Sequence, residues 1–229
     1  SVLGEIDSKD LGFTLMHEHV MVAASGLSIH YPDLLGPNRE ERAIECLKTA
    51  KAHGIDTMLD ATTFDLGRDP ALLKAVAQAS SVNLINVTGW WLDVPRFMQG
   101  VGANQMADEF IKDLTEGFRG TDIKAGMLKC AADFEGVTPP LETMARAVAR
   151  AHLQTGVPIM VHSYPTGQVA RRQIAIFKEE GVDLGRVKID HSNDTTDTEY
   201  LKWILDQGCF LGLDRYPGRL VSPHMRTVT

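Results

Sequence analysis

Two histidines that stand two residues apart, His17 and His19, lie in the segment FTLMHEHV (13–20), whose apolar residues predict a β-strand. Because alternate residues of a strand point to the same side, both imidazoles would face one space and Glu18 would face the other way. Two imidazoles aimed at one point can ligate a metal ion. For this pair alone, the alternative is one buried, hydrogen-bonded histidine beside a solvated one.

Two further histidines follow apolar runs: His162 in PIMVHS (158–163) and His191 in VKIDHS (187–192). Each stands where a predicted strand ends, which is where side chains from several strands meet in a barrel. They strengthen the hypothesis of a metal site. The remaining histidines are predicted to be surface or packing residues: His30, His53, His152 and His224.

Lys129 lies among apolar neighbours toward the end of the run AGMLKCAA (125–132). An ammonium group is costly to bury, so this lysine is predicted to be paired, to have a lowered pKa or to be chemically altered. A snorkelling lysine or a salt bridge is the structural alternative. A second functional hypothesis is that Lys129 is a catalytic lysine that forms a Schiff base.

The elements that must position these residues form a regular pattern, in which apolar runs alternate with segments of helical spacing. The predicted strands cover 13–20, 57–62, 83–89, 125–132, 158–163, 187–192 and 209–214, and the predicted helices cover about 38–53, 69–80, 104–119, 139–154, 167–180 and 196–207. Several helices end in glycine, as in AHGID and KEEGV. The alternation predicts the α/β class, with parallel strands joined by right-handed crossovers.

The remaining choice is between an open sheet and a closed (β/α)8 barrel. No glycine-rich phosphate loop follows a strand, and the candidate residues fall at the ends of several strands, so the barrel is favoured. No linker or low-complexity run interrupts the chain, which predicts a single domain over 1–229.

The composition narrows the possible partners. A formal charge of −7 argues against nucleic acid and anionic membrane as partners, because both are bound by clustered Lys and Arg. The three cysteines, which are widely spaced, form no disulfide framework or CxxC motif. No membrane-spanning run or signal peptide is recognised, so a cytoplasmic protein is expected.

The ordered set MHEHV, GMLKCA, VHS and DHSND, together with TGWW (88–91) and GLDRYP (212–217), resembles the phosphotriesterase-like branch of the amidohydrolase superfamily. The similarity runs through almost the whole chain. The resemblance implies that His17 and His19 bind one divalent metal, that His162 and His191 bind a second, and that an N-carboxylated Lys129 bridges the two. Zinc is the favoured metal, with manganese, cobalt or iron as alternatives.

The resemblance further implies hydrolysis of lactones or related carboxylic esters by a metal-bridging hydroxide, with promiscuous phosphotriesterase activity. Asp194 would relay a proton or orient the water, although a helix N-cap is an equal alternative for it. Arg215 would lie near metals and substrate, or be a surface arginine. Trp91, rather than Trp90, would cover the site. Two strand-end acids could hold ligand histidines: Asp60 and Asp214.

Family members continue into an eighth strand that ends in a metal-ligating aspartate, whereas this sequence stops at PHMRTVT. The expected fold is therefore a barrel truncated after its seventh strand, present as a fragment, as a chain completed by another, or as a degenerate form. Exposed strand edges and the family both suggest a homodimer. Two other functions stay open: a catalytically silent metal-binding or interaction protein, and a metal-free lyase or aldolase that uses Lys129.

Overall fold

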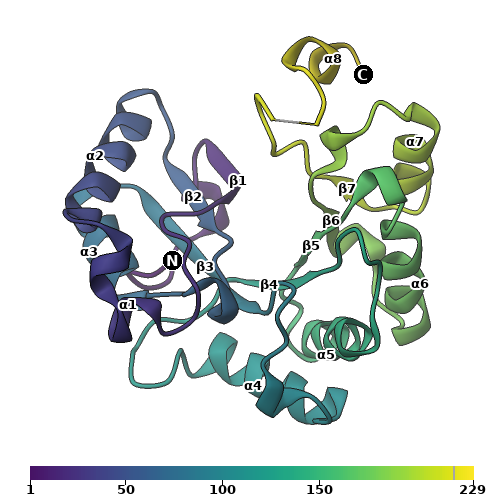
Figure 1. Cartoon of the computed structure of the whole chain (residues 1–229), viewed down its shortest axis with the longest axis horizontal. Coiled ribbons are helices and arrows are strands. Elements are labelled where there is room, and N and C mark those ends of the chain that lie inside the picture. Colours follow the sequence, from purple (N-terminus) through teal and green to yellow (C-terminus); the bar gives the residue numbers. More distant parts are fainter. Residues whose placement is uncertain (219) are drawn as a thin grey trace. The chain divides into compact units, whose positions relative to one another are not determined.

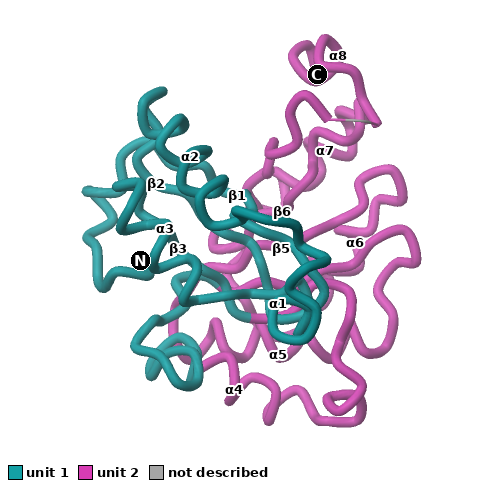
Figure 2. The backbone as a smooth tube through the Cα atoms, turned by 60° about the vertical axis from the view of Figure 1, so that its left-hand side comes forward, with its two compact units in different colours: residues 1–88, 112–127 teal, residues 89–111, 128–229 magenta. Residues whose placement is uncertain are grey.

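The computed structural model describes residues 1–218 and 220–229. The chain forms two compact units, coloured separately in Figure 2: residues 1–88 with 112–127, and residues 89–111 with 128–229. The prediction of a single domain stays a prediction. In the described residues, no helix is both long and apolar enough to cross a membrane.

The first unit is built on parallel strands that neighbour one another in chain order. Strand β1 (Thr14–Glu18) pairs with β2 (Thr57–Asp60), and β2 pairs with β3 (Asn83–Gly89), with Thr57 opposite Asn83. The helices that accompany them are α1 (Leu27–His30), α2 (Arg39–Ala52) and α3 (Pro70–Ser80). Helix α4 (Ala103–Thr115) follows β3.

Helix α3 shows how the sequence sets its own boundaries. The Asp69 carboxylate caps the helix by accepting a hydrogen bond from the Leu72 amide, and Pro70 occupies the first turn, where its missing N–H has no cost. Val76 and Leu73 face inward and are buried. The helix ends at Ser81, which is in the left-handed conformation.

The second unit repeats the same pattern. Strands β4 (Met127–Ala131), β5 (Ile159–His162), β6 (Val187–Ile189) and β7 (Phe210–Leu211) pair in parallel and in chain order. The helices are α5 (Pro139–Thr155), α6 (Ala170–Glu180), α7 (Thr198–Asp206) and α8 (Pro223–Val228). Strands β4, β5 and β6 are mostly apolar and buried, as expected for parallel strands covered on both faces, whereas Phe210 of β7 is exposed.

Figure 1 follows this succession of strand and helix from β1 to α8. It confirms the predicted α/β class and matches a (β/α)8 barrel through its seventh strand. The last two predicted strands are shorter than expected. The seventh covers only Phe210–Leu211. The sixth ends at Ile189, so Asp190 and His191 follow it, and His191 has a φ of 62°, which no strand residue adopts.

Candidate active site

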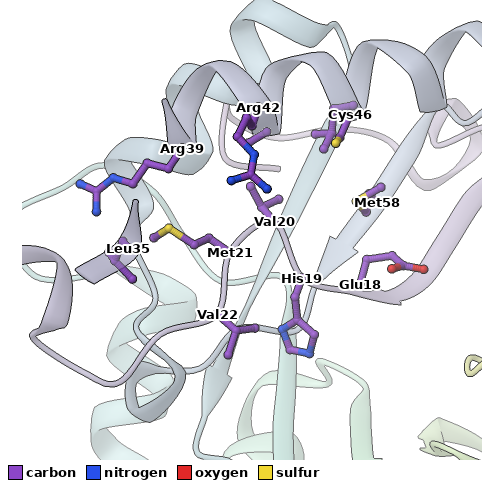
Figure 3. Close-up of a pocket in the computed structure, with 12 residues that line it drawn as sticks. Glu18, His19, Val20, Met21, Val22, Leu35, Arg39, Arg42, Cys46 and Met58 are labelled. Carbon is purple, nitrogen blue, oxygen red and sulfur yellow. The ribbon is translucent and has the colours of Figure 1, made fainter. Parts of the chain in front are cut away.

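In the first unit, His17 lies in β1 and His19 directly follows the last residue of the strand, Glu18. Their ring centroids lie 5.5 Å apart with an interplanar angle of 65°. His17 is buried and His19 is exposed. Figure 3 shows the Glu18 carboxylate pointing in a different direction from the His19 ring, which agrees with the alternation of side chains in a strand.

A short relay of hydrogen bonds fixes the His19 ring. Its Nδ1 lies 2.9 Å from the Thr62 hydroxyl, which in turn donates to the Asp60 carboxylate at 2.9 Å. Asp60 also accepts from the Asn86 side chain at 2.9 Å and from the Val20 amide at 3.0 Å. Asp60 therefore supports a predicted ligand histidine through Thr62, one step further away than the sequence suggested.

A pocket of about 430 Å³ lies beside His19, between the end of β1 and helix α2 (Figure 3). Apolar side chains line much of it, among them Val20, Met21 and Leu35, and Arg42 reaches over Val20 in Figure 3. The pocket is part of the first unit alone.

In the second unit, His162 from the end of β5 and His191 from the segment after β6 face each other. The Nδ1 atom of His162 lies 2.8 Å from the Nε2 atom of His191, and both side chains are buried. Each ring has a carboxylate at its other nitrogen. Asp133 lies 3.0 Å from Nε2 of His162, and Asp214 lies 2.6 Å from Nδ1 of His191.

This arrangement tests whether the residues fit a metal ion. Asp133 lies within hydrogen-bond distance of Nε2 of His162, and the negative charge of Asp214 beside Nδ1 of His191 favours a proton on that outer nitrogen as well. The facing nitrogens lie 2.8 Å apart, and a cation bound between them would replace the hydrogen bond that Nδ1 of His162 accepts from Trp91. The donor set of His162 and His191 therefore fits a divalent metal.

The electrostatics of His162 suit a ligand as well. Burial lowers the pKa of its imidazole to about 4, and the hydrogen bond to Asp133 only partly opposes this. A proton on His191 or an ammonium group on Lys129 would lower this pKa further. The ring is consequently neutral at physiological pH, which is the form that binds metals. The hydrogen bond from His162 is also the main reason why the pKa of Asp133 is lowered.

Lys129 occupies the middle of β4, where it is 1% exposed and stands opposite Met160 of β5. A glycine makes room for the backbone at this point. Gly89, with φ of 115°, lies so close to the Lys129 carbonyl that a Cβ atom would collide with it. The buried position predicted for Lys129 is therefore confirmed, and snorkelling to solvent is wrong.

The two tryptophans of TGWW have different surroundings. Trp91 donates from its indole nitrogen to Nδ1 of His162 at 3.2 Å, and its ring lies edge-on to that imidazole at 5.7 Å. Trp90 is buried and packs against Phe110 at 5.0 Å. Trp91 therefore contacts a candidate ligand, whereas Trp90 is part of the core.

Asp194 lies in a short 3-10 turn (Ser192–Asp194) and is 3% exposed. One carboxylate oxygen accepts from Nη1 of Arg215 at 2.6 Å and the other from Nη2 of Arg226. The N-cap of α7 is Asp197, which accepts from the Tyr200 amide at 3.0 Å. The capping alternative for Asp194 is thus wrong, because the turn places the helix start three residues later.

Arg215 is tied to this turn along its backbone too. The Asn193 side chain donates to the Arg215 carbonyl at 2.8 Å and accepts from its amide at 3.3 Å. The guanidinium side chain remains 43% exposed, and its charge contributes to the lowered pKa of Asp133. Arg215 is therefore close to the paired histidines while its side chain still reaches solvent.

The predicted residues thus fall into two groups. His17 and His19 belong to the first unit, and the remaining ones belong to the second: Trp91, Lys129, His162, His191, Asp194 and Arg215. Of the histidines predicted to be unrelated, His152 is buried with Nδ1 2.8 Å from the Val157 carbonyl, and His30, His53 and His224 are exposed.

Sequence reasoning missed four residues: Thr62, Asp133, Asn193 and Arg226. Asp133 and Thr62 follow strand ends by two residues, a position that could have drawn attention to them. Arg226 carried no local signal, because its partner Asp194 lies 32 residues earlier.

Comparison with known proteins identifies the family of the chain. Residues 1–229 match the model of the Phosphotriesterase family. The chain is 41% identical over 231 residues to a phosphotriesterase homology protein of Mycobacterium tuberculosis, covering 96% of this chain and 71% of that protein. It is 41% identical over 221 residues to an aryldialkylphosphatase of Saccharolobus solfataricus (95% and 70%) and 26% identical over 252 residues to the human N-acetyltaurine hydrolase (96% and 72%). With its motifs, fold and sequence in agreement over its full length, this chain belongs to the phosphotriesterase family.

Proposed function

We propose that this chain is a phosphotriesterase-like, metal-dependent hydrolase that acts on lactones or related carboxylic esters. The facing nitrogens of His162 and His191, each ring backed by a carboxylate, are the observation that carries the proposal. A cluster of buried neutral imidazoles without a cation would have no evident structural purpose, since it adds little to the core.

His17 and His19 would hold one divalent ion, His162 and His191 a second, and an N-carboxylated Lys129 would serve both. Zinc is the first choice, followed by manganese, cobalt and iron. When bound, such ions lower the pKa of water and polarise the oxygen of the bond to be cleaved. Burial of Lys129 favours its carboxylation, because an anionic oxygen ligand replaces a poorly solvated ammonium.

Other residues of the chain would orient the ligands and bind the substrate. Asp133 and Asp214 orient the two imidazoles. Trp91 supplies an aromatic wall next to His162, suited to a substrate with an apolar chain. Arg215, with its exposed guanidinium, is placed to donate to a substrate oxygen. Asp194 has both oxygens engaged by arginines, so we propose that it orients Arg215, whereas proton relay would require it to release one of them.

The relatives suggest two further substrate classes. An aryldialkylphosphatase at 41% identity supports aryl dialkyl phosphates as additional substrates. The N-acetyltaurine hydrolases are more distant, at 26% to 32% identity, and make an N-acyl amide a third candidate. Water attacks an electrophilic carbon or phosphorus in each case, so one site can serve them all.

The test is metal content per chain, measured by elemental analysis of protein purified without chelators, beside assays on a lactone, an aryl ester, an aryl dialkyl phosphate and N-acetyltaurine. About two metals per chain with turnover of the lactone or ester is expected. Replacing His162 by alanine should remove metal and activity, whereas His30→Ala, at an exposed histidine, should change neither. Unchanged metal content in His162→Ala would contradict the assignment.

Lys129→Ala separates the alternatives. We expect loss of metal and activity, with partial recovery when a short carboxylic acid is added as a substitute ligand. Full metal content and activity in this variant would exclude the bridging role. Metal binding without turnover of any substrate would favour a silent homologue, and borohydride trapping of a carbonyl substrate on Lys129 would favour a Schiff-base enzyme.

A further inference from the structure

Arg226 projects from the short helix α8 (Pro223–Val228) into the second unit, and its side chain is 0% exposed. A buried guanidinium is stable only when its donors are satisfied. Each of its three nitrogens has a partner here: Nε donates to the Val221 carbonyl at 2.9 Å, Nη1 donates to the Asn193 carbonyl at 2.7 Å, and Nη2 donates to the Asp194 carboxylate.

Asp194 stands between two arginines of different exposure. One carboxylate oxygen of Asp194 accepts from Arg226, and the other accepts from Nη1 of Arg215, whose side chain is 43% exposed. The carboxylate thus connects a buried cation to one that reaches solvent. Arg226 also donates to the Asn193 carbonyl, and the Asn193 side chain forms hydrogen bonds with both the carbonyl and the amide of Arg215. Arg226 is therefore connected to Arg215 in two ways, through the Asp194 carboxylate and through Asn193.

From this geometry we infer that Arg226 is a positioning residue that fixes the Arg215 side chain through Asp194 and Asn193. The inference rests on the proposed function, in which Arg215 contacts the substrate. Arg226 itself touches neither substrate nor metal. Its planar fork matters, because a lysine in its place would keep the charge but could not reach three acceptors that lie in different directions.

A substitution at Gly218 offers a second way to displace the Arg226 side chain without changing Arg226 itself. Its φ is 68°, and a Cβ atom at this position would collide with the guanidinium of Arg226. Gly156 is a matched control in the same unit, because its φ is 71° and a Cβ atom there would meet nothing within 4 Å. Alanine imposes the same backbone strain at both sites, but only at Gly218 does it displace Arg226.

The first measurement is independent of activity. In the 15N-labelled full chain, the Hε of Arg226 should exchange slowly with solvent, and the heteronuclear NOE of Arg215 Nε should be that of an ordered side chain. In Arg226→Lys and in Gly218→Ala, we expect Arg215 to become mobile. In Gly156→Ala and in Arg186→Lys, at an exposed arginine, it should stay ordered. An Arg215 side chain equally ordered in all variants would overturn the inference.

The second measurement is kinetic. On a substrate that the wild type hydrolyses, Arg226→Lys should lower kcat/KM by about 10- to 100-fold, the usual scale for a misplaced contact residue. Arg226→Lys and Arg215→Lys combined should cost little more than Arg215→Lys alone, because they act as one unit. Additive effects would contradict coupling through Arg215, since general destabilisation adds. Absence of turnover in the wild type would refute the proposed function, while the exchange and NOE data would still decide the role of Arg226.

Discussion

At the scale of single residues, the carboxylates next to the histidines decide what the imidazoles can do. Asp214 contacts His191 twice: one oxygen accepts from its backbone amide at 2.6 Å, and the other lies 2.6 Å from its ring Nδ1. The bond to the backbone amide and the charge beside Nδ1 favour the ring orientation in which Nε2 faces His162.

Asp214→Asn should leave the fold intact and weaken metal binding. The amide can be an acceptor for only one of the two donors that the carboxylate serves, so His191 loses orientation and basicity. We expect a loss of about 10- to 100-fold in metal affinity, measured by competition with a chelator of known affinity. Asp206→Asn, at an exposed aspartate in α7, is the matched control. Equal affinities in the two variants would show that Asp214 does not support a ligand.

Gly89 is the second residue with a consequence of its own. Alanine at this position would combine a disfavoured φ of 115° with a collision at the Lys129 carbonyl. We expect Gly89→Ala to lower the free energy of unfolding by more than about 3 kcal/mol, as a severe backbone conflict does. Gly100 has a φ of 94° with open space around it, so Gly100→Ala should lower the free energy of unfolding by only about 1–2 kcal/mol. Denaturant unfolding of both variants measures the difference.

At the scale of elements, helices α5 and α6 are joined by a network of surface ion pairs. Arg146 contacts Glu142 at 2.7 Å, Glu179 at 2.6 Å and Glu180 at 2.9 Å. Arg150 contacts Glu180 at 2.9 Å, and Arg172 reaches both Glu142 and Glu179. Hydrogen bonds from these arginines lower the pKa of all three glutamates below the ordinary 4.5.

The direction of these shifts predicts how stability depends on pH. Because the folded-state pKa of each glutamate is lowered, the unfolded chain takes up protons first as the pH falls. The network therefore stabilises the fold above about pH 4.5, and its contribution is lost as the pH drops through the folded-state values. Arg146→Gln should be less stable than the wild type at pH 7, and the difference in the free energy of unfolding should shrink as the pH falls below 4.5, by urea unfolding. A difference that stays the same as the pH falls would show that packing, not charge, is responsible.

At the scale of the whole molecule, large apolar side chains are exposed in both units. They include Phe13 (64%), Ile29 (77%), Phe134 (74%), Phe210 (62%) and Leu213 (62%). Exposed apolar side chains indicate an interaction surface when they are neighbours. Phe210 of β7 and Leu213 just after it are close in the chain, and they are the physical reason to expect association between chains.

We expect a homodimer in solution, with a mass twice the 25.1 kDa of one chain. Size-exclusion chromatography with light scattering over a range of protein concentrations measures this mass directly. Phe210→Asp, on the short strand β7, should shift the equilibrium toward the monomer if this strand is part of the interface. A monomer at every concentration would contradict the expectation.

The sequence by itself determined the βα succession and the strand end near which His17 and His19 lie. These features depend on periodicity and on residues close together in the chain, so the amino-acid pattern alone specifies them. The end of β6 was placed too late, because VKIDHS gives no local signal for the left-handed residue His191. Order and identity of motifs also sufficed to identify the family.

Only the tertiary structure decided which charges meet. Asp133 at His162, Asp214 at His191 and Arg226 at Asp194 are pairs separated by 29, 23 and 32 residues. No local pattern links such residues, because their proximity arises from the packing of strand ends and from the position of α8 within the second unit. The sequence therefore predicted the candidate ligands and named Asp214 as an acid that could support one of them, whereas the fold decided that Asp214 lies at His191 and that Asp133 lies at His162.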